Sequence, residues 1–171
     1  DSPLLGYQGV GALIAMVLYG LWTGRAHLKN VWLKAIGRAP HIDDSDEVMS
    51  YRGATIGSLG GMAVMAAWLW FMGTPAGIAV LFVVGAMLVF IGITRIVVEA
   101  GIPVVRSPLA MPDLILQGLG PGLVGAGGAV NMSLAYIWAA DIRVFVMATF
   151  SNGLKMIEEM APALRRRVFW G

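Results

Sequence analysis

Three long stretches without a single charged side chain, residues 3–23, 53–72 and 76–94, dominate the sequence. The hydrocarbon core of a bilayer is about 30 Å thick, and a helix of about 20 mostly apolar residues crosses it. Only 13% of the residues are charged, against roughly 25% in soluble domains. The sequence therefore predicts an all-α polytopic transmembrane helix bundle that occupies the whole chain.

Two further segments, 108–127 and 129–150, are long enough to cross but are interrupted. Prolines and glycines crowd residues 101–128, more than the interior of a regular helix tolerates. We expect a broken crossing at 108–127, buried in the bundle, and a fifth crossing at 129–150. The break either contributes to a transport site or is simply structural, and it is formed by Gly118, Gly120, Pro121, Gly122 and Gly125.

Basic residues predict the orientation of these five crossings. Five of them lie between the first two spans, in the loop 25–52, while the turn at 73–75 has none. Because basic residues favour the cytoplasmic side, the loop 25–52 is predicted to be cytoplasmic. The basic segment 151–171 reaches the same side only if 108–127 crosses and is not re-entrant. The prediction is a multi-pass protein of the inner (cytoplasmic) membrane.

The loop 25–52 begins with an amphipathic segment, residues 25–37. Its apolar side chains recur at helical spacing, which predicts a helix in the membrane interface or one packed on cytoplasmic protein. The sequence starts at Asp1 and ends in a basic anchor followed by apolar residues. We expect the chain to be part of a longer one.

An acidic run, HIDDSDEVMSYR at residues 41–52, precedes the second span. It lacks the alternating oxygen ligands and the central glycine of a calcium-binding EF-hand loop. Asp44 and Glu47 have the spacing of a capping box, which predicts that the second helix begins near Ser45. A docking role for Asp43 and Asp46 remains an alternative.

Glycines at four-residue spacing mark one face of the second span. Small residues at this spacing allow close approach of two helices in lipid. The sequence leaves open whether the partner helix belongs to this chain or to another subunit. The predicted packing face consists of Gly53, Gly57 and Gly61.

Five ionisable residues lie in or at the ends of the predicted spans. Arg95 and Glu99 share a helix face if the third helix continues past Thr94, either as a gating or proton-coupling pair or as an ion pair that ends the helix. Asp141 and Arg143 are two apart, so each needs another partner, from Arg95, Glu99, Arg106 or Asp113, or is solvated. The candidate polar pathway is Arg95, Glu99, Asp113, Asp141 and Arg143.

Several function classes find no support in the residues. The absence of cysteine excludes disulfides, cysteine-ligated zinc and iron–sulfur clusters. The two histidines have no acid or nucleophile at motif spacing, and GPGLVG at 120–125 lacks the preceding strand of a dinucleotide site. We therefore expect no catalytic residues, no metal, no cofactor and no nucleic-acid partner, and hence no enzyme.

One resemblance adds a family to these expectations. The run HLKNVWLKAIGRAPHIDDSDEVMSYRGA, and RIVVEAGIPVVRSPLAMPDL further on, resemble bacterial membrane proteins that look distantly related to oligopeptide transporters. The matching positions are Ser50, Tyr51 and Arg52 before a span, and Arg95, Ile96, Glu99, Gly101 and Pro103 after one. The resemblance implies a larger parent with many spans and a fold related to secondary transporters.

Two functions follow as expectations. The first is part of a solute transporter coupled to an ion gradient, although five crossings do not easily supply the two repeats of alternating access. The second is a non-catalytic structural or accessory subunit of a membrane complex. The expected partners are the lipid bilayer and other transmembrane helices, from a longer parent chain or from a complex.

Overall fold

The computed structural model describes residues 3–38, 47–102, 109–139 and 146–170, and these residues form helices and connections without a strand. The all-α prediction is confirmed. The helices are α1 (Pro3–Thr23), α2 (Arg25–Ala35), α3 (Tyr51–Phe71), α4 (Ala76–Ala100), α5 (Met111–Leu119), α6 (Pro121–Ala139), α7 (Val146–Met156) and α8 (Pro162–Trp170).

Three of these helices, α1, α3 and α4, are long and apolar enough to cross a membrane. This makes the chain a membrane protein, with spans where the three uncharged stretches predicted them. The predicted total of about five crossings is not confirmed. With nine residues, α5 is about 14 Å long at 1.5 Å per residue, which is about half of what a crossing needs.

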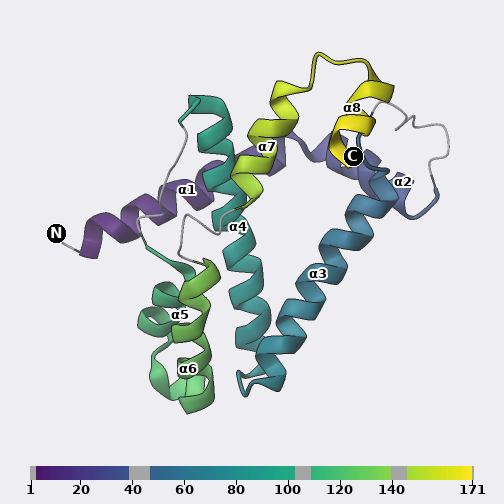
Figure 1. The fold of residues 1–171 in the computed structure, drawn as a ribbon. Helices are drawn as coiled ribbons and strands as arrows, with labels where there is room; N and C mark the ends of the chain where they lie inside the picture. Colours follow the sequence, from purple (N-terminus) through teal and green to yellow (C-terminus); the bar gives the residue numbers. More distant parts are fainter. Residues whose placement is uncertain (1–2, 39–46, 103–108, 140–145, 171) are drawn as a thin grey trace.

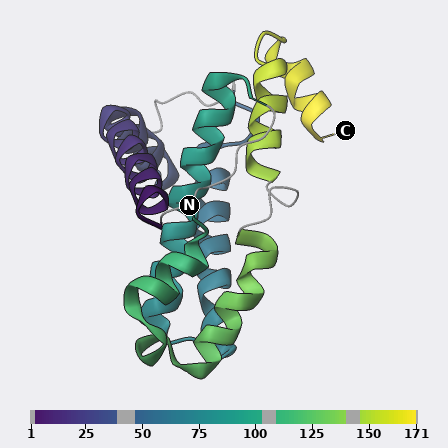
Figure 2. The same cartoon turned by 90° about the vertical axis from the view of Figure 1, so that its left-hand side faces the viewer.

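Helix α4 is the centre of the molecule, and the other long helices pack on it (Figure 1). In the most apolar 18-residue window of α4, 39% of the residues are buried, against 6% in the corresponding window of α3. Figure 2 shows α1 on one side of α4 and α7 on the other. Between them lies a cluster of buried side chains, Leu13, Val17, Val89, Ile93, Val97 and Ala148. A second cluster joins α4 to α3, α5 and α6 around Phe82 and Met132.

The predicted hairpin of the second and third spans is present. Helix α3 ends at Phe71, and Gly73 takes a φ of 95°, which allows the chain to reverse before Pro75. The two helices meet at this turn and diverge toward their other ends (Figure 1). Helix α4 continues beyond the predicted Thr94 to Ala100, where Gly101 ends it in the left-handed conformation.

The predicted start of the second helix near Ser45 is wrong. Helix α3 begins at Tyr51, and the side chain of Ser50 caps it by accepting a hydrogen bond from the backbone N–H of Gly53 at 3.2 Å. Ser50 satisfies an orphan N–H of the first turn at the point where the uncharged stretch begins. Glu47 precedes the helix and accepts a hydrogen bond from the hydroxyl of Tyr51 at 3.0 Å. Asp43, Asp44 and Asp46 lie outside the described residues.

Helices α1 and α2 follow one another with only Gly24 between them. Together they run across α4 in Figure 1, whereas α3 and α4 form a hairpin. The predicted amphipathic helix is present as α2, which has no buried residue. Its apolar residues Leu28, Trp32 and Ile36 are about half exposed, at 45%, 49% and 53%, as a face against lipid headgroups or another protein would be.

After α4 the chain returns toward the α3–α4 turn and then rises again beside α4 as α6 and α7 (Figure 1). Asn131 of α6 bonds to the turn at Met72 and Thr74, while Lys155 of α7 reaches the carbonyl of Val98 near the other end of α4. The described parts of the two basic segments, 25–52 and 151–171, therefore lie at the same end of the hairpin. The break predicted within 108–127 separates α5 from α6.

Candidate functional site: a broken helical hairpin

Two glycines break the helical path of the α5–α6 hairpin. Gly120 has φ 79° and ψ 155°, and Gly125 has φ 72° and ψ 166°, conformations that side chains rarely allow. Between them Pro121–Val124 forms a short turn whose axis is separate from the rest of α6. A Cβ atom added at Gly118 or Gly122 would have no neighbouring atom within 4 Å. The positive φ angles of Gly120 and Gly125 therefore require glycine at these two positions. At Gly118 and Gly122 the surrounding space would accommodate a side chain.

A carboxylate and an amide, one helical turn apart on α5, form the polar face of this hairpin. Asp113 is half-buried and accepts a hydrogen bond from the hydroxyl of Tyr136 on α6. Gln117 accepts one from the hydroxyl of Tyr7 on α1 at 2.5 Å. Residues four apart share a helix face. One face of α5 thus holds two tyrosine hydroxyls from two different helices.

Of these residues, only Asp113 was identified from the sequence as a candidate site residue. Tyr7, Gln117 and Tyr136 were missed. The four-residue spacing of Asp113 and Gln117 was a local signal for a polar face. Nothing local connects α5 with Tyr7, which lies 110 residues away from Gln117.

Asn131 fastens the hairpin to the α3–α4 turn. Its amide donates to the backbone carbonyl of Met72 and to the hydroxyl of Thr74, both at 2.9 Å. Asn131 and Thr74 are 5% and 1% exposed. A side chain at Gly127 would lie 3.1 Å from the carbonyl oxygen of Gly73. This contact holds α6 to the turn between the two long helices.

A groove of about 540 Å³ opens between α3 and α6. Its walls are mainly apolar and include Trp68 and Trp138, while Asn131 lies in its lining. Trp138 also packs edge-to-face on the buried Phe82 of α4, with ring centroids 5.4 Å apart. The broken hairpin is therefore bordered by a lateral opening on the side of α3.

Arg95 and Glu99 form an ion pair at the other end of α4. Nε of Arg95 lies 2.6 Å from Oε1 of Glu99, and the two side chains are 38% and 59% exposed. The expectation that α4 continues and places both on one face is confirmed. The guanidinium group of Arg95 lies against Gly20 of α1, where a side chain would overlap it. Gly20 thus makes room for this pair between α1 and α4.

The candidate polar pathway separates into two pairs in the described part of the chain. No hydrogen bond or ion pair among the described residues joins Arg95 and Glu99 to Asp113 and Tyr136. Asp141 and Arg143, with the possible partner Arg106, lie outside the described residues. The predicted single pathway through all five residues stays a prediction.

We expect Glu99→Gln to change the free energy of unfolding by only about 0.5 kcal/mol or less, because exposed helix pairs of this spacing contribute little. Thermal unfolding in detergent measures this. The matched control is Glu158→Gln, which removes an exposed carboxylate outside any described ion pair. A destabilisation well above that of the control would show that the pair holds α4 in place.

The predicted packing glycines lie on the outer helix. A Cβ atom at Gly57 or Gly61, or at Gly60 beside them, would have no neighbouring atom within 4 Å, and one at Gly53 would meet only Ser50 and Met49. No helix in the described part of the chain packs on this face. No helix of the described part of the chain is therefore a partner of Gly53, Gly57 and Gly61.

Among the described residues no three side chains of histidine, aspartate or glutamate gather where a metal ion could bind. The polar face of α5 instead offers one carboxylate and one amide, which accept hydrogen bonds from tyrosine hydroxyls of α6 and α1. These groups accept and donate hydrogen bonds, and the carboxylate can take up and release a proton. The arrangement suits the binding of a polar solute or an ion.

Comparison with known proteins identifies one family. No curated protein and no solved structure matches the chain. The model of a family described as a family of unknown function, DUF6785, matches residues 1–171, which is the whole sequence. The match includes the three candidate spans and the broken hairpin, and the chain belongs to the DUF6785 family.

Proposed function

We propose that the chain is part of a solute transporter coupled to an ion gradient, and that the α5–α6 hairpin contributes to the solute path. The observation that carries the proposal is the pair of Asp113 and Tyr136 on a helix pair broken by Gly120 and Gly125. Ionisable residues within membrane domains are costly and mark ion or substrate routes by default. Transporters commonly place their sites at interrupted helices.

The Asp113–Tyr136 pair suits coupling to protons. As a carboxylate, Asp113 accepts a hydrogen bond from Tyr136; as a neutral acid it would donate one of its own. Proton uptake would thus change the bond between α5 and α6. Because Gly120 and Gly125 interrupt the backbone between the two helices, such a change can move α5 relative to α6.

The wider setting also supports transport. The resemblance to oligopeptide-transporter-like proteins implies a larger parent with many spans and a fold related to secondary transporters. The three candidate spans of this chain do not supply two repeats, so further helices, from a longer chain or a second copy, would complete the alternating-access unit. In this proposal the protein lies in the inner (cytoplasmic) membrane with 25–52 and 151–171 on the cytoplasmic side, and it performs no covalent chemistry.

Uptake into proteoliposomes tests the proposal. The purified protein, reconstituted with an inward proton gradient, is expected to accumulate labelled di- and tripeptides. Asp113→Asn should lower the rate at least about a hundredfold, the lower end of the range expected for loss of one general acid–base group, and Tyr136→Phe should lower it by less. Glu159→Gln, an exposed carboxylate on a distant segment, is the control.

Three outcomes decide among the assignments. Gradient-dependent uptake that is insensitive to Asp113→Asn removes the hairpin from the route. Uptake that survives both Arg95→Ala and Glu99→Gln removes that pair. Absence of gradient-dependent uptake across a set of peptides, amino acids and metabolites, by protein whose fold is intact by circular dichroism, contradicts transport by this chain.

A second candidate function is an accessory subunit of a membrane complex. It is favoured by the face of α3 that Gly57, Gly60 and Gly61 form, on which no other described helix packs. Only 6% of the residues in the most apolar window of α3 are buried. Because the sequence has no cysteine, Gly57→Cys introduces a single thiol on this face. Crosslinking in native membranes to a different protein would favour the subunit; the same crosslink between two copies would favour a self-assembled transporter.

A further inference from the structure

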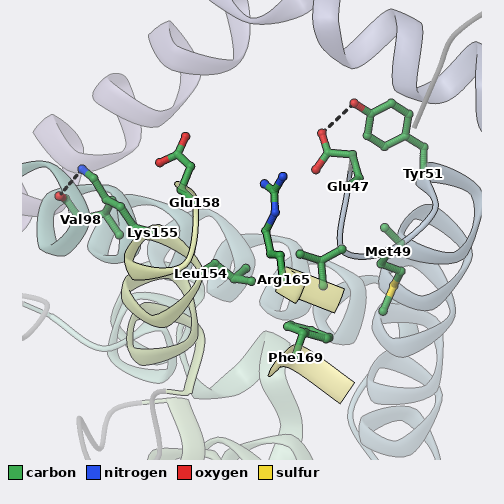
Figure 3. Close-up of a pocket in the computed structure, with 11 residues that line it drawn as sticks. Glu47, Met49, Tyr51, Val98, Leu154, Lys155, Glu158, Arg165 and Phe169 are labelled. Atoms are coloured by element: carbon green, nitrogen blue, oxygen red, sulfur yellow. Dashed lines mark hydrogen bonds between the residues drawn. The ribbon is translucent and has the colours of Figure 1, made fainter. Parts of the chain in front are cut away.

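A second site lies at the opposite end of the hairpin from the α3–α4 turn. A pocket of about 630 Å³ forms where the start of α3, the end of α4, α7 and α8 meet. It is lined by residues of both predicted cytoplasmic segments, 25–52 and 151–171, and is separate from Asp113 and Tyr136. Figure 3 shows its charged side chains standing above an apolar floor that includes Leu154 and Phe169.

The pocket holds two cations and two carboxylates. Lys155 and Arg165 come from the C-terminal segment, Glu158 from the same segment, and Glu47 from the start of α3. In Figure 3 the guanidinium group of Arg165 stands between Glu47 and Glu158. The formal charge of the lining is therefore zero, with positive and negative groups at separate positions.

One nitrogen of the Arg165 guanidinium group lacks a hydrogen-bond acceptor. Its Nε is buried and has no hydrogen-bond partner, which is costly for a charged donor unless a ligand supplies the acceptor. Lys155 makes only a 3.4 Å contact with the carbonyl of Val98. Arg165 thus has a donor to spare, as a phosphate site requires, while Lys155 lies beyond Glu158 in Figure 3.

The depth of the pocket matches the border of a membrane. Tyr51 is the first residue of α3 and Val98 lies just before the end of α4, and the uncharged stretches of both helices begin within a few residues of the pocket. Charged side chains at this level reach the headgroup region, while the apolar stretches lie in hydrocarbon. Cationic side chains between helices at this depth, such as Arg165, suit the phosphate of a lipid headgroup.

An apolar groove continues from the charged pocket. A cavity of about 420 Å³ between α7 and α8 has no charged residue in its lining, and Leu154 and Phe169 belong to both cavities. Phe150 and Phe169 meet edge-to-face across it, with ring centroids 5.3 Å apart. A ligand with a charged head and an apolar chain would fill both spaces.

We propose that this double cavity binds phosphatidylethanolamine. Its phosphate would lie against Arg165, its ammonium group would donate to the neighbouring carboxylate of Glu158, and an acyl chain would occupy the groove between α7 and α8. An anionic lipid would leave the carboxylates facing like charge. A choline headgroup has no N–H to donate to them. The proposal is independent of the proposed transport function.

Native mass spectrometry of the purified protein in detergent tests this site. The protein is titrated with phosphatidylethanolamine, phosphatidylcholine and phosphatidylglycerol of identical acyl chains. Phosphatidylethanolamine is expected to bind at least about fivefold more tightly than the other two, about 1 kcal/mol, as a few extra charge-assisted hydrogen bonds allow. Equal affinity for all three lipids, or a preference for phosphatidylglycerol, overturns the assignment.

Matched pairs of variants test the residues. Arg165→Gln should weaken phosphatidylethanolamine binding about tenfold, while Arg167→Gln, an exposed arginine on the same helix outside the lining, should leave it unchanged. Glu158→Gln should reduce the preference over phosphatidylcholine, and its neighbour Glu159→Gln should not. Equal effects within either pair would show that only general surface charge attracts the lipid.

A further variant separates a bound lipid from a soluble phosphate ester. Gly153 lines the groove, and a Cβ atom added there would have no neighbouring atom within 4 Å, so Gly153→Phe places a ring in open space. This variant should bind phosphatidylethanolamine more weakly, with its thermal unfolding unchanged. Millimolar glycerophosphoethanolamine should not displace the lipid from the unsubstituted protein. Unchanged binding by Gly153→Phe, or full displacement by the soluble ester, contradicts a lipid site.

Discussion

Asn131→Leu is expected to lower the free energy of unfolding by about 1–3 kcal/mol, the cost of leaving buried polar groups without partners. The substitution keeps the number and branching of the side-chain heavy atoms and removes the bonds to Met72 and Thr74. The carbonyl of Met72 is among the last of α3, which have no partner within the helix. Lipid or apolar protein around it offers no replacement.

Unfolding of the purified protein in mixed micelles measures this loss. Ser133→Ala is the matched control, because the Ser133 hydroxyl is exposed and bonds only to the carbonyl of Ala129 on its own helix. The double variant Asn131→Leu with Thr74→Val should cost less than the sum of the single variants, since they share one bond. Additive losses, or an Asn131 variant as stable as the control, would contradict the role of Asn131 as the fastening of the hairpin.

Gly92→Leu should separate α1 from α4 and cost about 1–3 kcal/mol, as overpacking of a close-packed contact does. A Cβ atom at Gly92 would lie 2.7 Å from Cγ of Leu13 and 3.0 Å from Cγ2 of Val17. Both neighbours are buried, with Val17 1% exposed, so neither side chain has space to move aside. The contact of α1 with the centre of the bundle depends on the missing side chain.

The matched control for this contact lies on the same helix. A Cβ atom at Gly77 of α4 would have no neighbouring atom within 4 Å, so Gly77→Leu should be neutral or slightly stabilising, because leucine has a higher helix propensity. Thermal unfolding and protease accessibility of α1 distinguish the two variants. If Gly92→Leu is as stable as Gly77→Leu and leaves α1 equally protected, the close contact of α1 with α4 is wrong.

The long spans were predictable because lipid imposes a local rule. An uncharged run of sufficient length has one favourable conformation in hydrocarbon, so α1, α3 and α4 follow from composition alone. The ends of the helices were less predictable from the sequence. The acids before the second span suggested a start near Ser45, but Ser50 provides a cap nearer to the apolar stretch, and helix ends depend on such single contacts.

The candidate site was predictable only in its local parts. Glycines and prolines signalled a break, and Gly120 and Gly125 indeed take positive φ. The spacing of Arg95 and Glu99 predicted their pair. The partners of Asp113 and Gln117, Tyr136 and Tyr7, lie 23 and 110 residues away, and no local pattern identifies them.

The sequence by itself determined that the long spans suit a lipid bilayer and that the fold is helical. The reason is that the length of an uncharged run, and the need to satisfy backbone polar groups in lipid, act within each segment. Only the tertiary structure decided which polar groups meet. Asn131 reaches the α3–α4 turn, the two basic segments close around one pocket, and Asp113 pairs with Tyr136 instead of Arg95. These contacts depend on how the helices cross, which is determined by close approaches such as Gly92 against Leu13 and Gly127 against Gly73.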